Sequence, residues 1–146
     1  MKKLITALCL AGCLALAAPA SAAVQTFGPD FSRFTIDVPD GWTATPNDGG
    51  CQLISPDQKS SFSLQVQKSG GKSAAELTKL IGEKMGGKIL GTKDIDPNQS
   101  ILEAEIDGVK IRLLVRVEGD KFLAVTMAGP DEDAMTKIMD TVNEAK

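Results

Sequence analysis

Residues 102–125, LEAEIDGVKIRLLVRVEGDKFLAV, decide the fold, because two turn signals separate three runs of alternating apolar and polar residues. Asp107-Gly108 is typical of a two-residue hairpin turn of the primed type, and Gly119-Asp120 can close a second hairpin. We therefore expect three antiparallel strands, of which the run 109–118 is central. The expected cross-strand pairs are Ile106 with Val109, Glu105 with Lys110, Glu103 with Arg112, Val117 with Phe122 and Val115 with Ala124.

The two faces of this expected meander differ in chemistry. One face is apolar and carries alternate residues of the first two strands, namely Leu102, Ala104, Ile106, Val109, Ile111 and Leu113. The other face of the central strand mixes long basic stems with apolar and acidic residues: Lys110, Arg112, Leu114, Arg116 and Glu118. A helix usually covers part of such a face, while the charged ends reach water. The alternative is a shallow ligand or partner site built around Arg112 and Arg116.

Two segments outside the meander have the pattern of amphipathic helices. Ser73 and Glu76 match a capping box, in which each side chain accepts a hydrogen bond from the backbone N–H of the other residue. Apolar residues then repeat at helical spacing as far as Met85, and two glycines follow, which tolerate the left-handed conformation that ends a helix. A second amphipathic helix is expected to close the chain, starting at Pro130 or Asp131 and carrying Ala134, Met135, Ile138, Met139 and Val142 on one stripe. Its acidic first turn suits the positive end of the helix dipole.

The first part of the chain is expected to form short strands. Strands are predicted over residues 33–38, 51–55, 61–66 and 88–95, with a hairpin turn joining the second to the third. Residues 43–50 are rich in turn formers and show no periodicity, so they are expected to form a loop.

The stretch FTIDVPDGW, residues 34–42, is a strand that leads into a Pro-x-Gly-Trp corner. It resembles the start of PsbP-like domains and their bacterial relatives, which include the DcrB-like lipoproteins, and the order of elements over most of residues 32–146 is similar. The resemblance implies an α+β fold, an α/β/α sandwich in which helices flank an antiparallel sheet of about six or seven strands. It also implies a family of mostly non-catalytic accessory proteins, and it carries no catalytic residues. Trp42 matches the corner tryptophan of the family and is expected to anchor the core, with a place on a binding surface as the alternative.

The first 22 residues have the pattern of an export signal. Lys2 and Lys3 precede an apolar run over residues 4–18, which is shorter than the ~20 residues that cross a bilayer. Small residues up to Ala22 match a signal-peptidase site. The expected division is a signal peptide over residues 1–22, a short N-terminal extension over residues 23–31 and a single domain over residues 32–146.

A second interpretation of the signal involves Cys13. The sequence Leu-Ala-Gly-Cys that ends at this residue looks like a bacterial lipobox, which would make Cys13 the lipidated first residue of an anchored lipoprotein. The apolar run continues past Cys13, so we favour cleavage after Ala22 and a periplasmic location. A lipid anchor at Cys13 in the bacterial envelope is the alternative, and it is the only route by which we expect membrane contact.

Composition excludes several classes of function. The chain contains no histidine, so His-dependent serine or cysteine hydrolases are excluded. It carries 16 Lys and Arg and 19 Asp and Glu; without the two lysines of the signal, the net charge is −5, which disfavours nucleic acid as a partner. Cys51 is the one cysteine that remains after cleavage at Ala22, and it lacks a histidine partner. We expect no catalytic, cofactor or metal site.

Two hypotheses for the function follow. The preferred one is an exported, non-catalytic periplasmic accessory or binding protein that contacts an envelope protein, with Trp42, Arg112 and Arg116 as candidate surface residues. The alternative is a carboxylate-based hydrolase or a small-ligand carrier with its site near the Trp42 loop, where Asp37, Asp40 and Asp48 would act.

Overall fold

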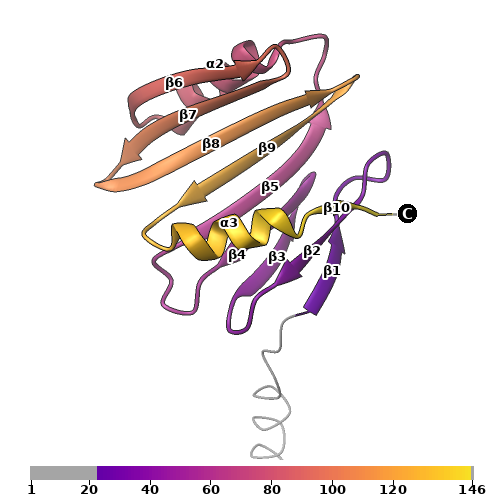
Figure 1. The fold of residues 1–146 in the computed structure, drawn as a ribbon, viewed down its shortest axis with the longest axis vertical. Helices are drawn as coiled ribbons and strands as arrows, with labels where there is room; N and C mark the ends of the chain where they lie inside the picture. The colour runs from indigo at the N-terminus through magenta and orange to yellow at the C-terminus, as the bar shows by residue number, and fades with distance from the viewer. Residues whose placement is uncertain (1–22, 146) are drawn as a thin grey trace, which may run out of the picture.

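The computed structural model describes residues 23–145. The predicted export signal and Cys13 lie outside the described residues, and the predicted cleavage site after Ala22 lies at their border. The described elements, in chain order, are β1 (Ala23–Phe27), β2 (Phe34–Val38), β3 (Thr43–Asn47), β4 (Gly50–Ile54), β5 (Ser61–Lys68), α2 (Ala74–Met85), β6 (Lys88–Asp96), β7 (Gln99–Ile106), β8 (Val109–Glu118), β9 (Lys121–Ala128), α3 (Glu132–Asp140) and β10 (Asn143–Glu144). They form an α+β fold, as expected (Figure 1).

Most strands belong to one antiparallel sheet of seven strands in the order β3-β4-β5-β9-β8-β7-β6. The register of β7, β8 and β9 is the predicted one, with Glu103 opposite Arg112 and Val115 opposite Ala124. The pairing of β5 with β9 joins the early strands to the later ones, with Leu64 opposite Val125. A second, three-stranded sheet has the order β1-β2-β10.

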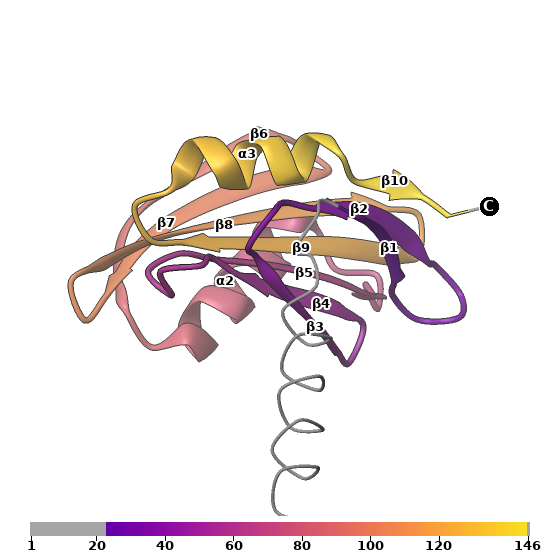
Figure 2. The same ribbon diagram turned by 90° about the horizontal axis from the view of Figure 1, so that it is seen from below.

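The two faces of the large sheet are covered by different elements. The helices α2 and α3 lie on opposite sides of the sheet (Figure 2). On one side, α2 packs through Ala74 and Leu77 on a core formed by β7, β8 and β9. On the other side, α3 and the small sheet enclose a second core, to which Met135 and Ile138 of α3 contribute. Alternate residues of β9 enter each core, as the period of a strand requires.

The helix ends follow the predicted chemistry. The backbone N–H of Ser73 donates to the carboxylate of Glu76 at 2.9 Å, and the N–H of Glu76 donates to the hydroxyl of Ser73 at 3.2 Å. The capping box is therefore complete. Gly86 ends α2 with φ of 72°, the left-handed conformation expected there. The helix α3 begins after Asp131 and ends at Asp140, so Val142 of the predicted stripe lies beyond the helix.

Two expectations for the N-terminal part are wrong. Residues 23–31 were expected to form an extension outside the domain, but β1 pairs with β2 along its whole length and buries Phe27. Residues 43–50 were expected to form a loop, but β3 occupies most of this segment. Pro46 has no backbone N–H to donate. It is tolerated in β3 because this is an edge strand, whose outer side pairs with no other strand of the sheet.

We predict that Gly50→Ala destabilises the fold, because a Cβ at the start of β4 would meet the backbone carbonyl of Leu64 on β5. The two strands would have to separate, so we expect the free energy of unfolding to fall by about 2–3 kcal/mol. Gly91→Ala in β6 is the matched control, because its Cβ would enter open space. Urea denaturation of both variants checks this, and equal stabilities would contradict it.

Candidate functional site

Half of one sheet face is open on the side of α3. On that side, α3 and the small sheet pack over β4, β5 and β9, while the neighbouring strands β8, β7 and β6 extend beyond them (Figure 1). Every residue of β6 is exposed. We call this surface the open half-face. Its residues are Ile101, Glu103, Lys110, Arg112 and Arg116, and Leu114 lies at its border, where it also packs on the core under α3.

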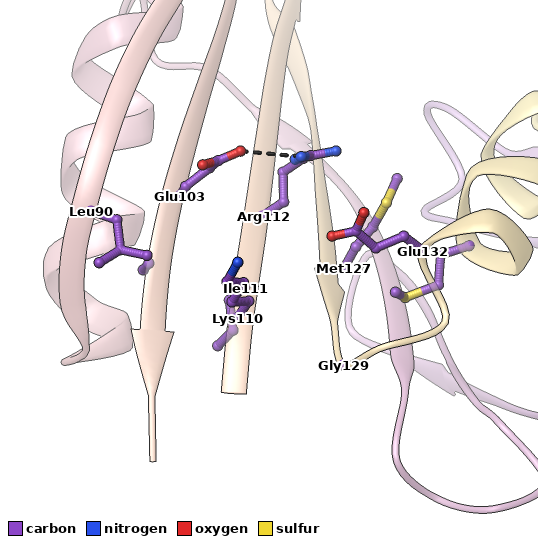
Figure 3. A pocket seen from close by; sticks show the side chains of 10 residues that line it. Leu90, Glu103, Lys110, Ile111, Arg112, Met127, Gly129 and Glu132 are labelled. Carbon is purple, nitrogen blue, oxygen red and sulfur yellow. Dashed lines mark hydrogen bonds and ion pairs between the residues drawn. The ribbon is translucent and has the colours of Figure 1, made fainter. Parts of the chain in front are cut away.

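Arg112 lies at one end of the open half-face. Its Nη2 atom donates a hydrogen bond of 3.1 Å to Oε1 of Glu103 on β7, which is the cross-strand pair predicted from the sequence. Figure 3 shows the two side chains extending toward one another from neighbouring strands, with Met127 and Glu132 on the far side of Arg112. A small cavity of about 110 Å³ lies here, beside the start of α3. The side chain of Arg112 is 47% exposed, so its remaining donors can reach a partner.

Arg116 lies at the other end of α3, beside a larger cavity. Its Nε atom is 3.0 Å from Oε1 of Glu118, and its side chain is 61% exposed. The adjacent cavity has a volume of about 290 Å³, and we call it the apolar cavity. Its apolar walls are Phe34, Leu64, Val66, Leu114, Leu123, Val125, Met139 and Val142.

Lys121 stands at the mouth of the apolar cavity, and sequence analysis did not identify it. Its Nζ atom donates to Oγ of Ser32 at 2.9 Å and to Oε1 of Glu144 at 3.3 Å. These partners come from the two ends of the described chain. No local pattern could have revealed the arrangement, because it depends on how the small sheet packs on the large one.

The structure places Arg112 and Arg116 on one face and leaves Trp42 apart from them. The two arginines are separated along β8 by about 13 Å, with Leu114 between them. Trp42 precedes β3, which lies four strands away from β8, or about 19 Å across the sheet. The indole is half-buried and packs on the core beside Ala44. This position agrees with the core-anchoring role, and the three candidate residues do not form one site.

The three carboxylates near Trp42 do not come together in one cavity. Asp37, Asp40 and Asp48 are all exposed. Asp40 and Asp48 lie beyond opposite ends of β3, whose five residues span about 16 Å. Carboxylate pairs that share a hydrolytic reaction lie within about 10 Å of one another. Five cavities in residues 23–145 have their walls elsewhere, so the structure gives the hydrolase and carrier hypotheses no support at the Trp42 loop.

Two kinds of feature are absent from the residues that the structure describes. Between residues 23 and 145, no three Cys, Asp or Glu side chains gather in a way that could hold a metal ion. Over the same range, no helix is long and apolar enough to span a bilayer.

Cys51 is fully buried in the core under α3 and the small sheet. Burial raises the pKa of its thiol from 9.0 to about 11, and a hydrogen bond with the backbone of Leu64 lowers it only in part. The thiolate is the nucleophilic form of cysteine, so Cys51 is protonated and unreactive at neutral pH.

We predict that Cys51 makes stability depend on pH in the alkaline range. Below pH 9 the thiol is protonated in both states, and its contribution is fully present. As the pH rises from 9.0 toward 11, the unfolded chain loses the proton first, so folding stability falls by on the order of 2 kcal/mol. Urea denaturation against pH checks this, with Cys51→Ala as control because it lacks the thiol. Parallel pH profiles of the two proteins would contradict it.

Comparison with known proteins provides a likeness of fold. No family model matches the sequence, and no curated protein matches it. The solution structure of cyanobacterial PsbP, CyanoP, from Synechocystis sp. PCC 6803 superposes with a TM-score of 0.56 at 10% identity, covering 86% of this chain and 94% of that one. A crystal structure from Bacteroides thetaiotaomicron VPI-5482 has a TM-score of 0.47 at 13% identity, covering 77% of this chain and 45% of that one. The chain therefore has a PsbP-like fold, as its Pro-x-Gly-Trp corner led us to expect.

Proposed function

We propose that this chain is an exported, non-catalytic accessory protein that binds another envelope protein through the open half-face. The observation that carries the proposal is the exposure of Arg112 and Arg116 on a sheet face that α3 leaves uncovered. A PsbP-like fold is compatible with an accessory role. The pattern of residues 1–22 supports export to the periplasm.

The chemistry of the open half-face suits a protein partner. Ile101 and Leu114 form an apolar row across β7 and β8, and the pair of Glu103 and Arg112 forms a charged row beside it. Protein interfaces combine an apolar centre with a polar rim, and arginine is enriched among the residues that dominate their affinity. Because both signs of charge are present, the expected partner surface also carries both signs, arranged to complement these rows.

The other uncovered half of the sheet provides a contrast. On the α2 side, β5 presents Ser63, Gln65 and Gln67, which are polar and uncharged. Short amide and hydroxyl side chains of this kind are typical of a solvated sheet face, and they lack the aromatic and arginine residues that dominate interface energies. The two open halves therefore differ in composition, and only the α3 side combines exposed arginines with apolar residues.

We predict that the mature protein begins at Ala23. Cleavage after Ala22 would release the protein into the periplasm, whereas processing at Cys13 would tether it to a membrane through a lipid. Mass spectrometry of the protein purified from the envelope distinguishes the two cases by the mass of the N-terminal peptide. A diacylated Cys13 would contradict cleavage at Ala22.

We predict that reversing both charges with Arg112→Glu and Arg116→Glu abolishes partner binding without unfolding the chain. Both side chains are exposed, and exposed ion pairs contribute about 0–1 kcal/mol, so stability should change little. Binding is measured by photo-crosslinking in native envelopes, with the photoreactive residue at position 110 on the open half-face. Crosslinks that survive the double substitution would contradict the proposal.

Two controls separate recognition from folding. Lys79→Glu reverses an exposed charge on α2, on the opposite side of the sheet, and should leave the crosslink unchanged. The exchange of Glu103→Arg with Arg112→Glu keeps an ion pair between β7 and β8 but inverts its direction. It should preserve stability and weaken binding, because the pattern of charges toward the partner changes.

A further inference from the structure

The apolar cavity is a space that the described side chains leave unfilled. It lies between the sheet strands β5, β9 and β8 on one side and the end of α3 with the start of β2 on the other. Leu114, Leu123, Met139 and Val142 face it and remain only half-buried. Its volume of about 290 Å³ lies at the lower end of the range for ligand cavities, about 300–1,000 Å³. Apolar walls without partner atoms gain dispersion energy when an apolar group enters.

Three cations and two carboxylates line the mouth of the cavity, namely Arg33, Arg116, Lys121, Glu118 and Glu144. Each cation has a carboxylate partner: Arg33 pairs with Asp30, Arg116 with Glu118 and Lys121 with Glu144. The side chains of Asp30 and Glu144 are exposed, so an anionic group can take the place of one of them beside a cation, whereas a cationic group cannot.

Hydrogen-bond donors remain free at this mouth. The ammonium group of Lys121 has three donors, of which two are directed to Ser32 and Glu144. The guanidinium of Arg116 has five, and the contact with Glu118 involves only Nε. The side chain of Glu144 is 79% exposed, so it can turn toward water and release Lys121 to a ligand. Lys121 itself is held, because its side chain is only 20% exposed and Ser32 positions its Nζ atom.

We propose that the apolar cavity binds a free single-chain carboxylate, with the chain among Leu114, Leu123 and Met139 and the carboxylate on Lys121 and Arg116. A methylene group occupies about the volume of a water molecule, roughly 30 Å³, so the cavity holds a chain of roughly ten carbons. Two-chain lipids exceed this volume. The inference does not rest on the proposed envelope partner, although Arg116 belongs to both surfaces. Lys121 lies outside the open half-face, so its substitution tests the cavity alone.

The test is a chain-length series measured by isothermal titration calorimetry. The ligands are straight-chain carboxylates of four to fourteen carbons, each used below its critical micelle concentration. The protein is the mature form purified from the cell envelope. Each added methylene should tighten binding about fourfold until the chain fills the cavity at roughly ten carbons, after which affinity should level off. The absence of saturable binding, or an affinity that does not depend on chain length, would overturn the proposal.

Further titrations test separately which head group the ligand needs and where the ligand binds. Octanoate should bind about tenfold tighter than octanol, and octylamine should bind more weakly than either. Lys121→Gln should weaken octanoate about tenfold and leave octanol unchanged, whereas Lys79→Gln on α2 should alter neither. Leu123→Phe should weaken both ligands by narrowing the cavity. Equal affinities for octanoate and octanol, or equal effects of the two lysine substitutions, would contradict carboxylate recognition at the mouth.

Discussion

The antiparallel pairing of β5 with β9 is the interaction on which the other layers depend. These strands are far apart in the sequence, yet they align over the full length of each, with Leu64 opposite Val125. Without this ladder, the early strands β3 to β5 and the later strands β6 to β9 would be separate units. A slip of one residue would turn Val125 to the α2 side and Ala124 to the α3 side, and neither core could then form.

The small size of α3 and the three-stranded sheet explains both the open half-face and the apolar cavity. The helix α3 has nine residues and is about 14 Å long, whereas seven strands extend about 29 Å across the sheet. Even with the small sheet beside it, α3 covers only the half of its face that belongs to β4, β5 and β9. The open half-face is the remainder, and the apolar cavity lies where α3, the small sheet and the large sheet meet imperfectly.

Strong local signals predicted most of the later half of the fold. The turn at Asp107-Gly108 was sufficient to specify the partner of Arg112, and the turn at Gly119-Asp120 was sufficient to specify the partner of Val115. The early half was harder, because β1 and β3 are short and largely exposed strands, and β3 contains mostly polar and turn-forming residues. Pairing with β2 and β4 sets these strands, since β propensity depends more on neighbouring strands than on the residues themselves.

For the candidate sites, a strand pattern is enough to show that Arg112 and Arg116 share a face, because side chains alternate along β8. The same pattern cannot show that this part of the face stays open, or that Trp42 lies four strands away. Lys121 acquires its place beside Ser32 and Glu144 only when the two ends of the described chain meet. Periodicity is a property of neighbours along the chain, whereas exposure and cavities arise from contacts between residues that are distant in it, and these exist only in the packed structure.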